Sequence, residues 1–302
     1  MEVSVSIIMI TYNHEAFISK AIEGVLMQKT NFNYELIVAD DFSKDNNQNI
    51  IRRFAKENQE IIKPIFRNKN LGANQNWNDA YRHCLGKYVA ICEGDDFWID
   101  PYKLQKQVDF LEQNSDVMLC FTNSLVLTDS NKETKKWPIN LENRVYDPQE
   151  IMIDLLVPTC SAVFRKPDYS ILEKRLINPN YIFGDIILWL TLADYGKLFC
   201  LNEPMVVYRK NEGSAAFSLG INKIINLCQQ HEEISVDFGG KYELFENKLL
   251  SRSYFILAIK LLVKRDFKSF YFLKKSIKKR PIQLFYNILY LFKRMFSSSR
   301  KI

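Results

Sequence analysis

Three carboxylates stand close together at the end of an apolar stretch. In the sequence CEGDDFWIDP, residues 92–101, Glu93, Asp95 and Asp96 follow the apolar residues 88–92. Neighbouring like charges repel one another and resist burial unless a cation lies among them. Carboxylate oxygens are the ligands that hard divalent cations prefer. These residues therefore predict a metal site, and a metal held there could in turn bind a diphosphate.

Two earlier apolar runs, residues 3–11 and 35–39, also lead into polar side chains. The polar residues are Thr11, Tyr12, Asn13, Asp40 and Asp41. An Asp-Asp pair after a strand is by itself also typical of a solvated turn or a helix cap. Because the carboxyl ends of parallel strands form the ligand-binding edge of a doubly wound sheet, we expect all three strand ends to line one site.

The elements that must position these residues alternate between strand and helix. Strands are expected at residues 3–11, 35–39, 64–66 and 88–92, and helices at 16–27, 50–54, 75–84 and 103–113. The strands are continuous apolar runs, which is typical of strands buried on both faces. This alternation predicts an α/β fold with a doubly wound, mostly parallel sheet.

Two common phosphate-binding motifs are missing. No GxGxxG follows the first strand, and no GxxxxGK[ST] occurs anywhere in the chain. The sequence therefore argues against a dinucleotide site of the Rossmann type and against a P-loop. A phosphate bound without a glycine-rich loop needs another positive charge, and a metal held by the carboxylates would supply it.

Composition indicates an ordinary globular chain. Of the 302 residues, 47% are hydrophobic and 25% are charged. The six cysteines are scattered without a CxxC motif, so we expect buried free thiols in a reducing cytoplasm. The first residues lack the pattern of a signal peptide, and no apolar run reaches the roughly 20 residues that span a bilayer.

Charge is distributed unevenly along the chain. Residues 251–302 contain 14 Lys and Arg against a single acid, whereas the remainder has 27 bases and 34 acids. An acidic body argues against a nucleic-acid-binding core. Residues 249–263, 264–281 and 282–296 suggest basic, partly apolar helices. They could pack on the core or bind an anionic membrane surface, whereas RNA binding lacks a supporting motif.

Four blocks together resemble the family-2 glycosyltransferases of the GT-A fold. They are VSIIMITYNHEAFISKAIEGVLMQ, YELIVADDFSKDN, NKNLGANQNWNDAYRHCLGKYVAICEGDD and GDIILWLTLADYGK, and they cover roughly residues 1–215. The EGDDFWIDPYKLQKQVDFLE block looks most similar to a bacterial branch that builds surface polysaccharides. The resemblance implies transfer of a sugar from a nucleotide diphosphate to a hydroxyl, usually with inversion and with Mg²⁺ or Mn²⁺.

The resemblance also implies roles for individual residues. The donor nucleotide would contact Thr11, Tyr12, Asn13, Asp40, Asp41, Asn70, Gly72, Asn78, Glu93 and Gly94. Asp41 matches the carboxylate that accepts from the base N3–H, which suits uracil or thymine. Asp95 matches the metal-binding acid of the D-x-D motif, with Asp96 beside it. Asp185 matches the catalytic base, although alone it would more simply be a helix N-cap.

This sequence departs from the family pattern at four positions. Trp77 stands where a basic residue is common, which weakens the expected phosphate contacts of that helix. Glu93 stands at the first acid of D-x-D, and Gly184 replaces the Glu that commonly precedes the base. Asn211 stands where some members place a histidine near the metal. A third protein ligand for the metal is therefore not implied.

We thus expect a GT-A catalytic domain at residues 1–215 and a basic helical region at 216–302. Residues 1–100 would bind the nucleotide sugar, expected to be a UDP sugar, and residues 101–215 would bind a saccharide or lipid-linked acceptor. The expected location is the cytoplasm, in part at the inner face of the cell membrane. A nucleotidyltransferase and a non-catalytic nucleotide-binding scaffold remain as alternatives.

Overall fold

The computed structural model describes residues 2–128, 131–138, 140–176, 178, 181–210, 220–281 and 286. The chain forms two compact units. The first comprises Met1–Ile177 and Phe183–Ser214, and the second comprises Asn178–Ile182 and Ala215–Ile302. Within the described residues, the sheet and its covering helices belong to the first unit, and α8, α9 and α10 belong to the second.

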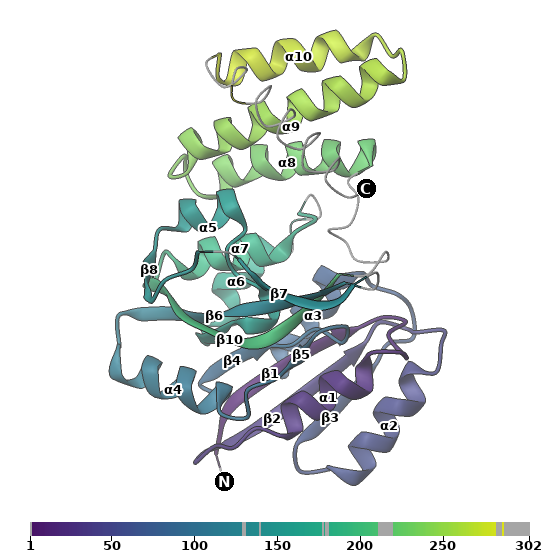
Figure 1. Cartoon of the computed structure of the whole chain (residues 1–302), viewed down its shortest axis with the longest axis vertical. Helices are drawn as coiled ribbons and strands as arrows, with labels where there is room; N and C mark the ends of the chain where they lie inside the picture. The colour runs from purple at the N-terminus through teal and green to yellow at the C-terminus, as the bar shows by residue number, and fades with distance from the viewer. Residues whose placement is uncertain are drawn as a thin grey trace. The chain divides into compact units, whose positions relative to one another are not determined.

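The described part of the first unit contains a ten-stranded sheet in the order β3-β2-β1-β4-β9-β6-β10-β5, with β7 paired to β6 and β8 paired to β10 (Figure 1). The strands are β1 (Val3–Thr11), β2 (Asn33–Asp40), β3 (Ile62–Phe66), β4 (Tyr88–Ile91), β5 (Phe97–Trp98), β6 (Val117–Thr128), β7 (Asn131–Trp137), β8 (Arg144–Tyr146), β9 (Val163–Arg165) and β10 (Lys197–Lys210).

The pairing of the first four strands is parallel throughout. In register, Thr11 of β1 lies opposite Asp40 of β2, and Ile8 of β1 lies opposite Ile91 of β4. The carboxyl ends of these strands therefore meet at one edge of the sheet. The second half is mixed, because β9 runs antiparallel to both β4 and β6, whereas β10 runs parallel to β6.

The helices connect and cover these strands. In the first unit they are α1 (Ile18–Leu26), α2 (Asn47–Glu57), α3 (Ala73–Arg82), α4 (Lys103–Gln113), α5 (Pro148–Asp154), the 3₁₀ turn η1 (Thr159–Ser161), α6 (Tyr169–Leu176) and α7 (Gly184–Leu192). The expected strand at residues 3–11 and the expected helix at 103–113 have the predicted bounds, and the expected α/β class with a mostly parallel sheet is confirmed.

The main hydrophobic core lies on one face of the sheet. Alternate residues of β1, namely Val5, Ile7 and Met9, pack there with apolar residues of α1, α2 and α4. The alternation follows from the period of two along a strand, which sends successive side chains to opposite faces. All six cysteines are buried free thiols, as the sequence predicts.

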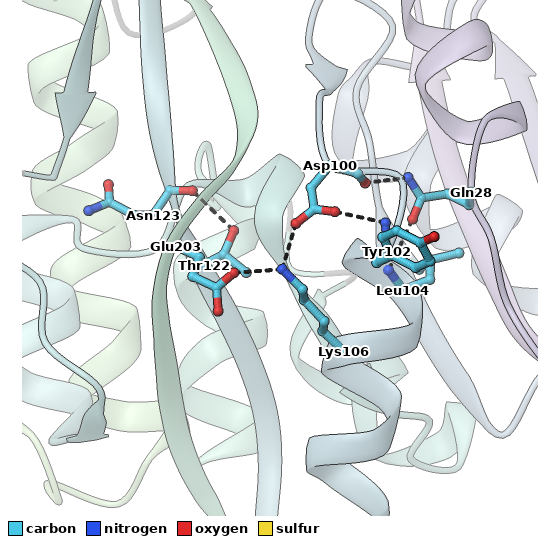
Figure 2. Close-up of polar contacts among 8 residues, drawn as sticks. All are labelled: Gln28, Asp100, Tyr102, Leu104, Lys106, Thr122, Asn123 and Glu203. Carbon is cyan, nitrogen blue, oxygen red and sulfur yellow. Dashed lines mark hydrogen bonds and ion pairs between the residues drawn. The ribbon is translucent and has the colours of Figure 1, made fainter.

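A polar network holds the turn that follows the acidic strand end (Figure 2). The Gln28 amide donates to the Asp100 carbonyl (2.8 Å), and its oxygen accepts from the Leu104 N–H (3.0 Å). Lys106 pairs with the carboxylates of Asp100 (2.9 Å) and Glu203 (2.6 Å). The start of α4 is thereby tied to the end of α1 and to β10, which fixes the chain leaving the acidic segment.

The second unit contains α8 (Ile221–Asp237), α9 (Glu243–Val263) and α10 (Lys268–Lys279). Apolar side chains of α8 and α9 form its core, including Ile224, Leu250 and Leu257. A buried contact of 2.7 Å between His231 Nδ1 and Glu246 Oε2 also joins these two helices. A membrane-crossing helix, judged by length and hydropathy, does not occur among the described residues. Most of the expected segment 282–296 lies outside them.

Candidate active site

The carboxyl ends of β1, β2 and β4 come together as the sequence predicts. The N–H of Asp41 donates to the Thr11 carbonyl (2.9 Å), and the N–H of Gly94 donates to the Ile10 carbonyl (3.0 Å). A Cβ atom on Gly94 would lie only 2.6 Å from Thr11 Oγ1. Glycine is therefore required at this position, because no larger residue allows the acidic segment to lie so close to the end of β1.

Asp40 is a buried acceptor that fixes the start of α2. Its Oδ1 accepts from the Ser43 N–H (3.0 Å) and from Gln48 Nε2 (2.7 Å). Its Oδ2 accepts from Asn47 Nδ2 (2.8 Å), which also donates to Thr11 Oγ1 (3.1 Å). The side chains of Asp40 and Thr11 thus belong to one hydrogen-bonded cluster beneath the strand ends.

Asp41 holds the loop that precedes α3. Its two carboxylate oxygens accept from the N–H groups of Leu71 (2.7 Å) and Gly72 (2.9 Å), and its carbonyl accepts from Asn70 Nδ2 (3.1 Å). Gly72 has a φ of 83°, a conformation that favours glycine. Because each carboxylate oxygen has two lone pairs, Asp41 retains capacity to accept from a ligand.

The remaining predicted donor residues differ in their surroundings. Tyr12 is exposed. Asn13 has a positive φ, and its Oδ1 accepts from the Lys44 N–H (2.8 Å). Asn78 is buried, and its Nδ2 donates to the Leu176 carbonyl at the end of α6 (3.0 Å). In this structure the Asn78 side chain therefore joins α3 to α6, and its predicted contact with the donor stays a prediction.

The acidic segment brings two carboxylates and a thiol together. One ligand atom from each of Glu93, Asp96 and Cys160 lies within 4.8 Å of the others. Glu93 Oε2 is buried and has no hydrogen-bond partner among the residues described. The prediction placed the metal on Asp95 and Asp96 and assigned Glu93 to the nucleotide. The structure groups Glu93 with Asp96, whereas Asp95 lies outside that group, and its metal contact stays a prediction.

Burial and mutual repulsion raise the pKa values of these acids. Burial and then the charge of Asp95 raise the pKa of Glu93 to about 8. Burial followed by the charges of Asp95 and Glu93 raises the pKa of Asp96 well above its usual range. Both shifts express the cost of two buried negative charges at one place. A cation among these carboxylates would remove that cost.

Arg209, near the end of β10, forms hydrogen bonds with the acidic segment at Asp95 and Asp96. Its backbone N–H donates to Asp96 Oδ1 (2.7 Å), and its Nε donates to the Asp95 carbonyl (3.0 Å). Sequence reasoning did not identify this residue, because the pairing depends on β10 lying beside β5. Asn211, which stands where some relatives place a histidine, lies outside the described residues.

Asp185 lies in the first turn of α7 and is close to the acidic group. Its Oδ2 accepts from Thr159 Oγ1 (3.1 Å), and its Oδ1 accepts from the Ile186 N–H (2.9 Å). Burial raises the pKa of Asp185, and these hydrogen bonds offset part of the increase. The charge of Asp185 in turn contributes to the raised pKa of Glu93. The helix cap is Phe183, so Asp185 is not the N-cap that its sequence context alone suggested.

The glycine before Asp185 has a packing reason. A Cβ atom on Gly184 would lie 2.8 Å from Asn74 Oδ1 on α3. A larger residue at this position would push α7 away from α3 unless the Asn74 side chain moved. Glycine, in place of the family's usual glutamate at position 184, therefore allows α7, which carries Asp185, to pack closely against α3.

A buried lysine supports the site from beneath. Lys103 Nζ donates to Gln107 Oε1 (2.7 Å) and lies 4.2 Å from the centroid of the Trp98 ring. Gln107 Nε2 donates to the Ser161 carbonyl (3.0 Å), and Trp98 Nε1 donates to the Cys160 carbonyl (2.8 Å). These contacts fix η1, which carries both the thiol beside Asp96 and the hydroxyl that binds Asp185.

Comparison with known proteins agrees with this geometry. The family model described as Glycosyl transferase family 2 matches residues 6–172, more than half of the chain. The chain belongs to glycosyltransferase family 2. This confirms the resemblance found in the sequence, and the chain has a GT-A fold.

Relatives of the chain include proteins named for an activity and uncharacterized proteins. An uncharacterized protein of Mycobacterium tuberculosis is 33% identical over 68% of the chain, which spans 58% of that relative. The UDP-Glc:alpha-D-GlcNAc-diphosphoundecaprenol beta-1,3-glucosyltransferase WfgD of Escherichia coli is 26% identical over 84% of the chain and 90% of its own length. TuaG of Bacillus subtilis, a putative teichuronic acid biosynthesis glycosyltransferase, is 26% identical over 68% of the chain and 78% of its own length.

Solved structures support the fold. TarS of S. aureus in complex with UDP-GlcNAc aligns with a TM-score of 0.64 at 16% identity, over 91% of this chain and 79% of that structure. The mannosyltransferase PcManGT of Pyrobaculum calidifontis, in complex with GDP-Man and Mn²⁺, aligns with a TM-score of 0.54 at 16% identity, over 92% and 74%. At such identities the likeness bears on the fold alone.

Proposed function

We propose that this glycosyltransferase moves a sugar from a nucleoside-diphosphate donor, most fittingly a UDP sugar, to a hydroxyl of a saccharide or lipid-linked saccharide, with inversion at the anomeric carbon. One observation carries the proposal. Thr159 of η1 donates to Asp185 Oδ2 (3.1 Å), and the next residue, Cys160, lies in one group with Glu93 and Asp96. A proton acceptor and a group of metal-type ligands therefore share one site.

The donor is proposed to bind across residues 1–100. The adjoining ends of β1 and β2 carry Thr11, Tyr12, Asn13 and the contact between Asp41 and Gly72. Asp41 can accept from the N3–H of uracil through a remaining lone pair. Among the similar proteins, WfgD is named for UDP-Glc and PcManGT is bound to GDP-Man. The choice of UDP thus rests on Asp41, with Asp40 as its support.

A divalent metal, Mn²⁺ or Mg²⁺, fits the acidic group. Glu93 Oε2 is buried without a partner among the described residues, and Asp96 lies beside it. Hard cations prefer carboxylate oxygen to sulfur, so Glu93 and Asp96, with Asp95 adjacent, would hold the metal in preference to the Cys160 thiol. The bound cation would stabilise negative charge on the departing diphosphate.

Asp185 is proposed as the general base. Its raised pKa makes its carboxylate a better proton acceptor than an ordinary aspartate. As the acceptor hydroxyl attacks the anomeric carbon and the bond to the diphosphate breaks, the hydroxyl proton passes to Asp185. Thr159 holds one carboxylate oxygen in place and leaves the other lone pairs for the substrate.

The test is donor turnover by Asp185→Asn. We expect the variant to bind UDP with Mn²⁺ as the unmodified protein does but to lose at least about 10²-fold in transfer and in slow donor hydrolysis. Release of UDP would be measured with a panel of UDP sugars. Pyrophosphate release from a nucleoside triphosphate and a sugar phosphate would indicate the alternative, a nucleotidyltransferase. Donor binding without any turnover would indicate a non-catalytic scaffold.

The second unit is proposed to hold the enzyme on an anionic membrane surface. The turn between α9 and α10 exposes Val263, Phe267 and Phe270 to solvent, and the basic residues Lys264, Arg265 and Lys268 are exposed beside them. Apolar side chains among bases suit a headgroup region, where each base adds about 1 kcal/mol. Such attachment would fit a lipid-linked acceptor.

A further inference from the structure

A pocket in the first unit has no role in the site described above. Its volume is about 440 Å³, and its lining includes Trp137, Tyr146, Leu156, Arg144 and Glu150. Small-molecule sites commonly have volumes of about 300–1,000 Å³ and combine aromatic walls with a few polar groups. The pocket therefore has the size and lining of a ligand site.

One wall of the pocket leads to the acidic group. Trp137 stacks on Tyr208, with ring centroids 5.6 Å apart and planes inclined by 27°. Tyr208 directly precedes Arg209, whose N–H donates to Asp96 (2.7 Å). The charges of Asp96, Glu93 and Asp95 add to burial in raising the pKa of Tyr208. The stacked pair thus spans from the pocket to the acids.

Another wall leads to Asp185. Leu156 lines the pocket, and three residues later Thr159 donates to Asp185 Oδ2 (3.1 Å). The short segment between them includes the buried residue Val157. The pocket is thereby connected to both the acidic group and the proposed base, each through only a few residues.

The lining favours a neutral ring that carries hydroxyl groups. Arg144 and Glu150 form a two-fold hydrogen-bonded pair (2.9 and 3.0 Å) with both side chains partly exposed. Their charges neutralise one another, which disfavours an anion, while the carboxylate keeps lone pairs for hydroxyl donors. The partly exposed ring of Trp137 offers a flat apolar surface for the C–H face of a sugar. Tyr146 is buried, and the Arg144 guanidinium lies 3.7 Å from its ring centroid, so it supports the Arg144–Glu150 pair.

We propose that this pocket is a subsite for the acceptor, and that it binds a saccharide unit adjoining the sugar whose hydroxyl reacts. This inference rests on the proposed function, because it assigns the acceptor of the same reaction. Trp137 is its stacking platform, and the Arg144–Glu150 pair binds the hydroxyl edge of the ring.

The experiment compares Trp137→Ala with Trp77→Ala. Trp77 is a matched control, because it is also partly buried and stacks on a tyrosine, Tyr81, at 5.3 Å and 24°. Binding of methyl glycosides and disaccharides of common hexoses and N-acetylhexosamines would be measured by saturation-transfer NMR in the presence of UDP and Mn²⁺. The same sugars would be tested for stimulation of UDP release from UDP sugars.

We expect at least one saccharide to bind the unmodified protein. Trp137→Ala should weaken that binding and raise the KM for the same saccharide in the UDP-release assay by about tenfold. Trp77→Ala should leave both unchanged, and Trp137→Phe should restore most of the affinity. If Trp137→Ala does not fold, Arg144→Lys replaces it, since a lysine cannot form the two-fold pair with Glu150.

Two results would overturn the subsite. One is that no saccharide in the panel binds, and the other is that all variants at Trp137 and Arg144 bind saccharide as the unmodified protein does. The proposed function is judged separately by the binding of UDP with Mn²⁺ and by donor hydrolysis in the absence of sugar. If the unmodified protein neither binds UDP with Mn²⁺ nor hydrolyses the donor, the sugar-transfer proposal itself is contradicted. If it does both, and the variants bind saccharide as well as it does, only the subsite is contradicted.

Discussion

At the scale of single residues, the site is defined by carboxylates kept in an unfavourable environment. Glu93, Asp96 and Asp185 are all held where burial raises their pKa values. Perturbed acids in one place are typical of functional sites. Their partners differ, however, since Asp185 accepts two hydrogen bonds while Glu93 has an oxygen with none among the described residues. This difference supports the roles proposed for them, a general base for Asp185 and a metal ligand for Glu93.

The raised pKa of Glu93 predicts a specific pH dependence for the metal-free protein. Unfolded Glu93 ionises near 4.5 and folded Glu93 near about 8, so between these values the unfolded chain holds fewer protons. Stability should therefore fall as the pH rises from about 5 to about 8. Glu93→Gln should reduce this fall, as measured by chemical denaturation at a series of pH values.

Metal binding should act on the same residues. Saturating Mn²⁺ should raise the melting temperature of the unmodified protein at pH about 8, because the cation binds the ionised carboxylates of the folded state. Glu93→Gln should show a smaller increase, whereas Asp109→Asn, a change on α4, should behave as the unmodified protein does. An equal increase in all three proteins would place the metal elsewhere.

At the scale of elements, the position of the site depends on α4 and η1. Lys103 of α4 is completely buried, and through Gln107 and Trp98 it supports the carbonyls of η1. Burial lowers the pKa of Lys103 to about 8. Lys103, a residue type that is uncommon in protein interiors, thus lies next to the segment that carries Thr159 and Cys160.

Lys103→Met tests this arrangement. Between about pH 8 and 10.5 the unfolded chain holds the Lys103 proton while the folded chain has released it. The contribution of Lys103 therefore makes stability rise with pH in this window, by about 3 kcal/mol in total. The methionine variant should lack that rise in denaturation measurements. Lys87→Met, at an exposed lysine, serves as the control, and an equal slope in both variants would show that Lys103 is not the group responsible.

At the scale of the whole molecule, charge and apolar surface gather in the last fifty residues. The excess of bases in residues 251–302 contrasts with the acidic remainder. The described part of this region exposes aromatic side chains at the α9–α10 turn. An anionic membrane would attract this segment and repel the rest of the chain, and salt would screen both effects.

The double variant Phe267→Ser, Phe270→Ser should reduce sedimentation with phosphatidylglycerol vesicles severalfold, because it removes apolar side chains from the headgroup region. The unmodified protein should bind at low salt, detach at high salt and ignore phosphatidylcholine vesicles. Leu244→Ser, at an exposed leucine beside acidic Glu243, is the control. If unmodified protein does not sediment with anionic vesicles at low salt, the second unit is not a membrane anchor.

The sequence by itself determined the first half of the sheet and the strand ends of the donor side. The runs at residues 3–11 and 88–92 are apolar and short, and local pattern suffices to identify buried parallel strands. Parallel topology then places Thr11, Asp40 and Glu93 at one edge. The family blocks further indicated Asp185 and the activity, because several separated motifs agreed in order.

Only the tertiary structure decided which of these side chains meet. The pairing of β10 with β5 and β6 brings Arg209 to Asp96, and η1 brings Cys160 and Thr159 to the acids. These contacts join residues roughly 25 to 115 positions apart, which no local spacing encodes. The grouping of Glu93, rather than Asp95, with Asp96 and Cys160 likewise depends on the course of the backbone after β4. That path is set by the packing of Gly94 against Thr11 rather than by the order of the acids in the sequence.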